Sequence, residues 1–172
     1  FKDVELLQSN IEAVTGHIRG KLVVAGEQDV ERKVLEFIPL KEGGKTYWTD
    51  GVEYWRVSKL IKDSITIETV NPEYSYYAGK AFGEFQAMLA DIPQQLGETI
   101  PDFHNTPARY EAFRQAIENN ISGRLDEAKE EIEFALSKEV DASKLTDMIK
   151  TGDLPVRVTH NDTKINNVLF DV

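Results

Sequence analysis

The hydrophobic pattern of the chain changes near residue 71, and this change favours a fold that joins a small sheet to a block of helices. Beyond this point, apolar side chains recur at helical spacing in one stripe: Tyr74, Ala78, Ala81, Phe82, Phe85, Met88, Leu89 and Ile92. Asn71 is a candidate N-cap, and Pro72 occupies the first helical position, where its missing N–H costs nothing. The sequence therefore predicts a long helix that begins at residue 72.

Another helix and a strand are expected before this point. Asp3 is a candidate N-cap for the first helix. Apolar residues follow it at helical spacing, at Leu7, Ile11, Val14 and Ile18. This pattern predicts an amphipathic helix over residues 3–19, whose end is weakened by Gly16 and Gly20. Apolar residues between positions 34 and 38 then predict a strand.

A tight turn is predicted at the Asp-Gly pair of residues 50–51. Both positions of a two-residue hairpin turn need positive φ, which Asp and Gly adopt more readily than most residues. Extended runs at residues 45–48 and 53–61 flank the pair, so a small antiparallel sheet is expected. The Gly-Gly-Lys-Thr run at residues 43–46 lacks the first glycine of a phosphate-binding P-loop, because that position is Pro39, and we interpret it as a turn.

Several helices are expected after the long one. The Thr-Pro pair at residues 106–107 repeats the signal of a cap followed by proline and predicts a helix over residues 107–120. A charged helix is expected to follow Gly123, and its carboxylates are interpreted as a solvated face. Asp141 is predicted to cap a short helix that ends at Gly152.

The order of these elements predicts an α+β chain with two unequal lobes. We expect a partial N-terminal lobe at residues 1–62, with a helix and antiparallel strands, and a partial, mostly helical C-terminal lobe at residues 63–172. The C-terminal lobe would end in two extended runs, residues 155–159 and 168–172, on either side of a polar loop. Because the first residue is Phe1 and the last run stops without a turn, we expect a piece of a longer protein.

The composition restricts the partners and the compartment. A net charge of −10 and a pI of about 4.8 argue against nucleic acid and anionic membranes as partners, since both select basic surfaces. The chain has no cysteine, which excludes disulfides, thiolate catalysis and cysteine-based zinc sites. It has no apolar run of membrane-spanning length and no signal peptide, so a cytoplasmic protein is expected.

The polar loop carries the pattern H-x-D-x-x-x-x-N at His160, Asp162 and Asn167. This is the spacing of a kinase catalytic loop, and phosphoryl transfer explains each residue type. Asp162 suits the group that takes the proton of the acceptor hydroxyl, and Asn167 offers a neutral oxygen ligand to Mg²⁺. Lys164 could place positive charge on the transferred phosphoryl group, or it could be a solvated surface lysine. We expect His160 to brace the loop through hydrogen bonds.

Residues 160–169 resemble the catalytic loop of the phosphotransferase family that includes aminoglycoside and choline kinases, which have a protein-kinase-like two-lobed fold. The Asn-Asp-Thr-Lys-Ile-Asn-Asn run at residues 161–167 is most similar to that of N-acetylhexosamine 1-kinases. Residues 54–57, 78–86 and 100–106 support the resemblance. It extends over nearly the whole chain, and the loop is its specific part.

The resemblance implies ATP and Mg²⁺ as cofactors and the anomeric hydroxyl of an N-acetylhexosamine, a small sugar, as the acceptor. It makes Asp162 the base and Asn167 a metal ligand, and it places the adenine near residues 59–63. Glu5 or Glu12 would pair with a strand lysine that holds the phosphates. Two alternatives stay open, namely a kinase of another small alcohol (choline, an aminoglycoside or a thiosugar) and a non-catalytic pseudokinase used for binding.

The sequence departs from the family pattern at the groups that contact phosphate and metal. Members of the family have a glycine-rich loop and a strand lysine before the first helix, and neither precedes it here. Their second metal-binding aspartate lies beyond the catalytic loop, and Asp171 is only four residues after Asn167, too close to take that place. We therefore expect this chain by itself not to turn over.

Overall fold

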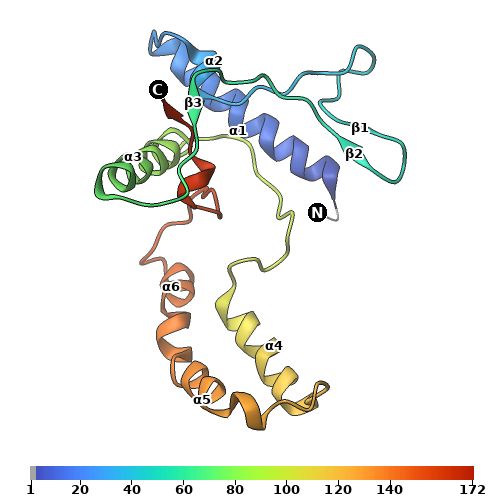
Figure 1. Ribbon diagram of the computed structural model, residues 1–172, viewed down its shortest axis with the longest axis vertical. Helices are drawn as coiled ribbons and strands as arrows, with labels where there is room; N and C mark the ends of the chain where they lie inside the picture. The colour runs from blue at the N-terminus through green and yellow to red at the C-terminus, as the bar shows by residue number, and fades with distance from the viewer. Residues whose placement is uncertain (1–2) are drawn as a thin grey trace. The chain divides into compact units, whose positions relative to one another are not determined.

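The computed structural model describes residues 3–172 as an α+β chain with two compact units (Figure 1). One unit contains the chain up to Thr99 together with Arg157–Val172, and the other contains Ile100–Val156. The first unit therefore joins the first half of the chain to the predicted catalytic loop, although most of the helical block lies between them in sequence. The lobe boundary expected after residue 62 stays a prediction.

The first helix is longer than expected. Helix α1 (Val4–Val24) begins at Asp3, whose carboxylate accepts a hydrogen bond from the Leu6 N–H at 2.8 Å, as a capping residue does. The predicted end at residue 19 is wrong, because the helix continues through both glycines for one more turn. That turn carries Leu22, which packs against the hydrophobic core, and this burial offsets the glycine cost of about 1 kcal/mol each.

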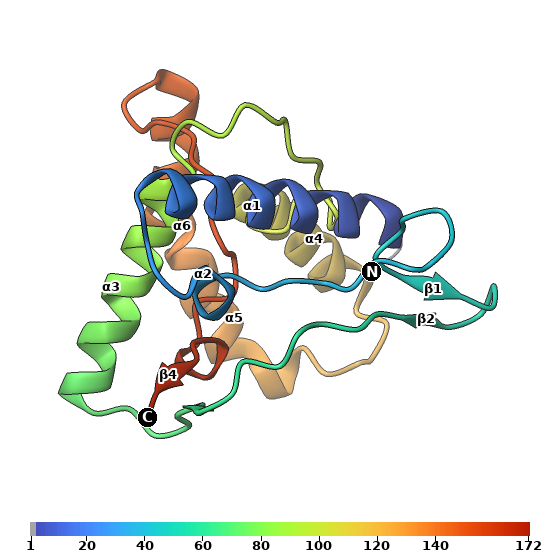
Figure 2. The same cartoon turned by 90° about the horizontal axis from the view of Figure 1, so that it is seen from above.

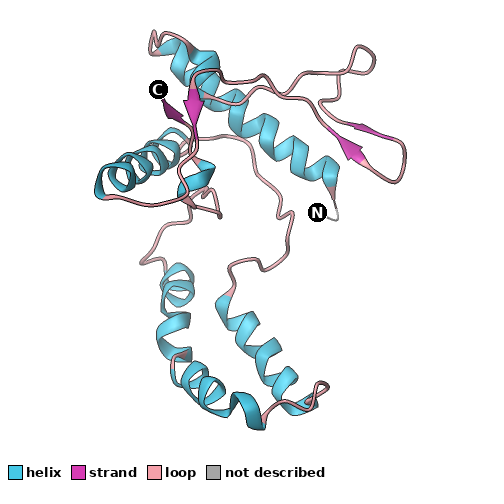
Figure 3. Ribbon diagram, in the orientation of Figure 1, coloured by secondary structure: helices cyan, strands magenta, loops and turns pink. Residues whose placement is uncertain are grey.

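The segment between α1 and residue 71 is mostly irregular (Figure 3). It contains the single-turn helix α2 (Val30–Lys33), the hairpin strands β1 (Trp48–Thr49) and β2 (Tyr54–Trp55), and the strand β3 (Ser64–Ile65). The strand expected at residues 34–38 is present only as a bridge between Phe37 and Ser58. An Ile38 N–H to Val57 carbonyl hydrogen bond of 2.8 Å joins the same two segments.

The turn between β1 and β2 has a different geometry from the predicted one. Thr49 pairs with Tyr54, so four residues rather than two form the connection. Gly51 has positive φ (93°), whereas Asp50 does not. The Asp50 carboxylate instead accepts the N–H groups of Glu53 at 2.7 Å and Val52 at 2.9 Å, which lowers the pKa of Asp50.

Helix α3 (Pro72–Met88) confirms the long predicted helix. The Asn71 side chain accepts the Tyr74 N–H at 2.8 Å and caps its start. At the other end, the Lys21 ammonium donates to the Met88 carbonyl at 2.8 Å and also pairs with Asp91, whose pKa it lowers. A cation at this position stabilises the negative end of the helix dipole. Figure 2 shows the C-terminal ends of α1 and α3 next to each other.

The hydrophobic core of the first unit lies where α1 meets the end of α3. Its buried members are Ile18, Val34 and Leu89. Partly buried side chains surround them: Val14, Leu22, Val30, Phe85, Met88, Ile92 and Val158. Val158 lies two residues before the His160 of the predicted catalytic loop. The core therefore fixes the chain at the point where that loop begins.

The second unit is helical. It contains α4 (Thr106–Asn119), the 3-10 turn η1 (Asp126–Ala128), α5 (Lys129–Ser137) and α6 (Glu139–Thr151). Two predicted caps are wrong by one or a few residues. Asn105 caps α4, with its side chain accepting the Ala108 N–H at 3.3 Å, and Asp141 lies inside the first turn of α6. Gly152 ends α6 with φ of 83°, as predicted.

The longest of the helices in residues 3–172 is α1, with 21 residues. It carries charged side chains along its length, among them Glu5, Glu12, Arg19 and Lys21. Within this described range, no helix has both the length and the apolar character needed to cross a membrane.

Truncation of Leu89 tests the assignment of the core. Leu89 is 2% exposed, so Leu89→Ala removes packed methyl groups and is expected to lower the free energy of unfolding by about 2 to 5 kcal/mol. Leu60→Ala is the matched control, because Leu60 is 83% exposed, and we expect a change within about 0.5 kcal/mol. Urea denaturation followed by circular dichroism measures both. Equal shifts of the two midpoints would contradict this core.

Candidate phosphoryl-transfer site

The chain before the predicted catalytic loop and the chain after it differ in structure. Residues 155–159 do not form the expected strand, and the chain before His160 is irregular. After the loop, strand β4 (Phe170–Asp171) pairs antiparallel with β3, with Ser64 opposite Asp171 and Ile65 opposite Phe170. The ladder thus joins the end of the loop to the segment that precedes α3.

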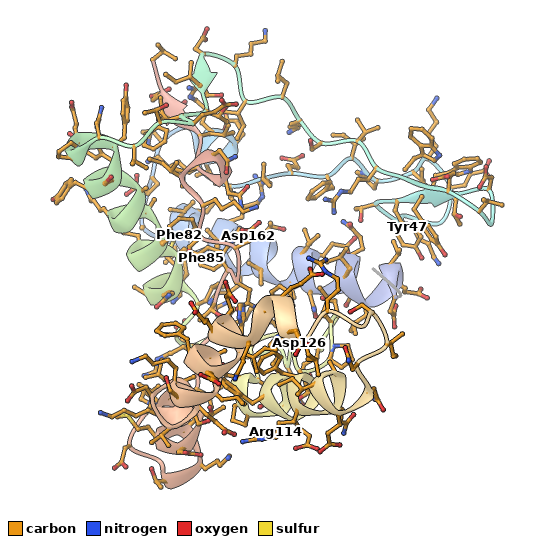
Figure 4. The ribbon with its side chains drawn as sticks, turned by 60° about the horizontal axis from the view of Figure 1, so that its bottom comes forward. Tyr47, Phe82, Phe85, Arg114, Asp126 and Asp162 are labelled. Carbon is orange, nitrogen blue, oxygen red and sulfur yellow. The ribbon has the colours of Figure 1, made fainter. Side chains whose placement is uncertain are left out.

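The start of the loop packs on the second half of α3. Val158 contributes to the core, and the His160 ring contacts Phe82 and Phe85 edge-on, with ring centroids 5.5 and 5.9 Å apart. Figure 4 labels these two phenylalanines together with Asp162 on the loop. His160 therefore braces the loop, as expected, but through ring contacts with α3.

The end of the loop packs on the first half of the same helix. Phe170 is buried, and its ring meets that of Tyr74 edge-on at a centroid distance of 5.0 Å. Tyr74 and Phe85 are eleven residues apart, which corresponds to about 16 Å along a helix axis. Helix α3 therefore sets the distance between the two ends of the loop.

Inside the loop, Asn161 turns the chain into the left-handed region, with φ of 65°. Asn tolerates this conformation better than most residues. The Thr159 hydroxyl donates a 2.6 Å hydrogen bond to the Asn161 side-chain oxygen. We did not predict a role for Asn161. The signal that could have revealed it is the known preference of Asn for positive φ, in a loop that must turn before Asp162.

The side chain of Asn167 is oriented by the backbone of Asp162. Its amide nitrogen donates to the Asp162 carbonyl at 2.8 Å. Asn167 itself closes the 3-10 turn η2 (Ile165–Asn167), in which its N–H donates to the Lys164 carbonyl at 3.0 Å. Because the amide nitrogen is used in this way, the amide oxygen is the atom that we expect to face a ligand. A neutral oxygen of this kind is suited to bind Mg²⁺.

Lys164 and Asp162 lie within reach of the same ligand. The Lys164 ammonium is 3.5 Å from a carboxylate oxygen of Asp162, and the two side chains are 68% and 51% exposed. An ion pair this exposed contributes little to stability. The ion pair matters for chemistry instead, because it places a carboxylate next to a positive charge. A hydroxyl group could meet the carboxylate where a phosphoryl group meets the ammonium.

An open groove of about 470 Å³ lies between α3 and the predicted catalytic loop. Its walls come from α3 and its approach on one side and from the loop on the other: Val70, Ser75, Ala78, Gly79, Phe82, Thr163 and Ile165. Thr163 stands between Asp162 and Lys164 in sequence, but neither of these two residues lines the groove. Small side chains at three of the α3 positions leave the space open.

The groups expected to support a nucleotide are engaged with other parts of the chain. Glu5 pairs with Lys45 at 3.3 Å, and Glu12 accepts a hydrogen bond from the Thr46 hydroxyl, so the choice between these two glutamates stays open. The described residues contain no group of three or more His, Cys, Asp or Glu side chains that could hold a metal ion. The assignment of Asn167 as a metal ligand stays a prediction.

Residues 59–63, the linker expected near the adenine, are held by the segment that follows α1. Glu36 pairs with Lys59 at 2.8 Å, and the Lys59 N–H donates to the Glu36 carbonyl at 2.9 Å. Lys59 is the main cause that lowers the pKa of Glu36, with Arg19 adding to it. These contacts hold Lys59, at the start of the linker, against the segment after α1. Sequence reasoning did not reveal them, because they join charged residues with no motif.

The chain matches the model of a known protein family. The model of the phosphotransferase enzyme family matches residues 39–171. This range begins before the β1–β2 hairpin and includes α3, the helical unit, the loop and β4. It covers more than half of the chain and all three candidate residues of the loop.

The hydrogen bond from Asn167 to Asp162 yields a prediction that does not depend on activity. Asn167→Asp keeps the size of the side chain but removes the donor, and we expect the loop to lose about 1 kcal/mol of local stability. The Val168 amide, which donates to the Ile165 carbonyl at 3.1 Å, should then exchange its hydrogen roughly fivefold faster. Amide exchange followed by NMR measures this rate.

Asn166→Asp is the control for that substitution. It makes the same change of charge at the neighbouring position, whose exposed side chain lies outside the Asn167–Asp162 hydrogen bond. Equal acceleration in both variants would show that charge, and not the lost hydrogen bond, controls the loop.

Proposed function

The chain belongs to the phosphotransferase enzyme family, and from this premise we propose that it transfers the γ-phosphoryl group of ATP to a hydroxyl group of a small sugar. The observation that carries the proposal is the arrangement of the loop. Asp162 is exposed with Lys164 beside it, and the Asn167 amide is turned by its bond to the Asp162 carbonyl. Phosphoryl transfer depends on positioning and charge, which are the properties that this loop supplies.

Asp162 is the proposed general base. Its carboxylate accepts the proton of the acceptor hydroxyl as the oxygen forms a bond to the γ-phosphorus. The bond between this phosphorus and the oxygen that bridges to the β-phosphate breaks, and the electron pair leaves with ADP. Helix α3 fixes both ends of the loop, so the carboxylate needs little reorganisation before it accepts the proton.

Asn167 is the proposed metal ligand, through its side-chain oxygen. Mg²⁺ bound there would neutralise charge on the phosphate oxygens of ATP. The residues fit this ion only in part, because a Mg²⁺ site uses oxygen ligands and several waters, and the loop supplies one oriented amide oxygen with a carboxylate nearby. The hydrogen bond to Asp162 couples the two roles, because movement of either residue shifts the other.

Lys164 is the proposed partner of the transferred group. In the structure its ammonium neutralises Asp162. When a phosphate enters, the ammonium can turn toward the more negative oxygens and leave the carboxylate free to accept a proton. The exposed position and flexible stem of this lysine permit such a movement.

For the acceptor we propose the anomeric hydroxyl of an N-acetylhexosamine. The support is the resemblance of residues 161–167 to the loop of the kinases that use these sugars. We also propose the two-lobed kinase-like arrangement, with ATP and Mg²⁺ as cofactors and a cytoplasmic setting. There are two alternatives to this proposal: a kinase of another small alcohol, and a pseudokinase without turnover. The assay below distinguishes them.

The assay measures ADP release with Mg²⁺ and ATP across a panel of sugars and amino alcohols. It uses the natural protein that carries this chain, because turnover by the chain alone is not expected. Release should depend on the acceptor and be highest with N-acetylhexosamines. Asp162→Asn should lower kcat by about a hundredfold or more, because the base is lost. Asp147→Asn, at an exposed pair with Lys150, is the control and should leave kcat unchanged.

Each result has a defined meaning. Activity with an amino alcohol or aminoglycoside alone would keep the mechanism and replace the acceptor. A folded protein that binds ATP but releases no ADP with any acceptor would contradict the proposal and favour the pseudokinase. Full activity in Asp162→Asn would remove this residue from the role of base.

A further inference from the structure

We infer that Arg32 is a positioning residue that holds the linker at residues 62–63 and the strand after the catalytic loop in one arrangement. The inference rests on the proposed function, because it assigns a role to Arg32 in the placement of Asn167 and of the nucleotide linker. No sequence motif points to this arginine. Its role follows from what its guanidinium contacts.

One guanidinium group joins two segments that are far apart in sequence. Arg32 lies in the single turn α2, and its terminal nitrogens donate to the Lys62 carbonyl at 2.7 Å and to the Asp63 carbonyl at 3.4 Å. The same group forms an ion pair with the Asp171 carboxylate at the end of β4. Its side chain is 32% exposed, whereas that of Asp171 is 80% exposed. Arg32 is therefore the half-buried member that anchors the pair.

The backbone of the linker at Asp63 has a conformation that needs a restraint from its surroundings. Asp63 has φ of 51°, in the left-handed region that non-glycine residues seldom occupy. Its carbonyl also accepts the Val172 N–H at 3.2 Å, so it receives one bond from Arg32 and one from the chain after β4. A backbone in this conformation persists only where its surroundings fix it. Arg32, which lies in α2 and outside the β3–β4 pairing, supplies that restraint.

The ladder between β3 and β4 is too short to hold by itself. Two residue pairs form it, and an isolated pair of strands is marginally stable even when it is longer. Asn167 lies four residues before Asp171, which is at most about 14 Å of extended chain. A change in the β3–β4 pairing would therefore move Asn167, and a slip by one residue would reverse the side chains of β4.

Arginine has the geometry that this position requires. Its planar group presents several N–H donors in fixed directions, so it bonds two carbonyls and a carboxylate at the same time. A lysine at position 32 keeps the positive charge but has one ammonium group in place of the planar fork. This group would form a good hydrogen bond to one of the three partners and lose the others. Arg32→Lys is thus the conservative variant that separates charge from geometry.

The first test measures amide hydrogen exchange by mass spectrometry and requires no turnover. In Arg32→Met, segments 62–66 and 164–172 should exchange roughly tenfold faster, the ratio that corresponds to losing one good hydrogen bond to a charged group. Segment 72–88 of α3 should be unchanged. Arg32→Lys should give an intermediate rate. Arg124→Met is the control, because Arg124 pairs on the surface with Glu127 in the second unit.

If Arg32→Met unfolds the protein, the same exchange measurement is made on Asp171→Asn instead. This variant keeps the two carbonyl contacts of Arg32 and removes only the ion pair, so a smaller acceleration is expected in the same two segments. Unchanged exchange in these segments, in whichever of the two variants is folded, would overturn the inference.

The second test uses the proposed reaction. Arg32→Met should raise KM for MgATP roughly tenfold and shift the Mg²⁺ dependence to higher concentration, with KM for the acceptor unchanged. Arg32→Lys should recover part of the loss. An active wild-type protein with an unchanged KM for MgATP in Arg32→Met would contradict the inference and leave the function intact. Faster exchange in Arg32→Met, with no turnover in the wild type, would contradict the function and leave the positioning role intact.

Discussion

The placement of the predicted catalytic loop depends on helix α3, because both ends of the loop pack on it. His160 contacts Phe82 and Phe85 near one end of the helix, and Phe170 contacts Tyr74 near the other. A loop that must present polar groups to water has few apolar contacts of its own, so its shape follows from where its ends are fixed. The core around Leu89 holds α3 against α1 and thereby supports the whole arrangement.

Some polar groups of the loop form hydrogen bonds that shape it, and others remain available to contact a ligand. The Asn167 amide nitrogen bonds the Asp162 carbonyl, and the Thr159 hydroxyl bonds Asn161. The Asp162 and Lys164 side chains are exposed as a pair, and Asn167 is an exposed residue bonded to the Asp162 backbone. This division lets a short loop keep its shape and still present the proposed base, cation and metal ligand.

Local signals in the sequence predicted part of the local structure. The start of α3 follows from Asn71 and Pro72, and the end of α6 follows from Gly152, because caps act within a few residues. The extension of α1 was missed, since it depends on the packing of Leu22 in the core. The pairing of Ser64 with Asp171 was also beyond sequence reasoning, because it joins strands more than a hundred positions apart. Of the site, the motif identified the residue types, whereas the restraint by Arg32 required the structure.

The most direct test of the account is a crystal structure of the natural protein with Mg²⁺ and a non-hydrolysable ATP analogue. The account predicts that the metal lies about 2.1 Å from the Asn167 side-chain oxygen, the usual Mg²⁺–oxygen distance. The Asn167 nitrogen should still donate to the Asp162 carbonyl, and the Asp162 carboxylate should face the terminal phosphoryl group. His160 and Phe170 should keep their contacts with α3. A nucleotide whose phosphates bind away from residues 160–167, or a loop that leaves α3 to reach them, would contradict it.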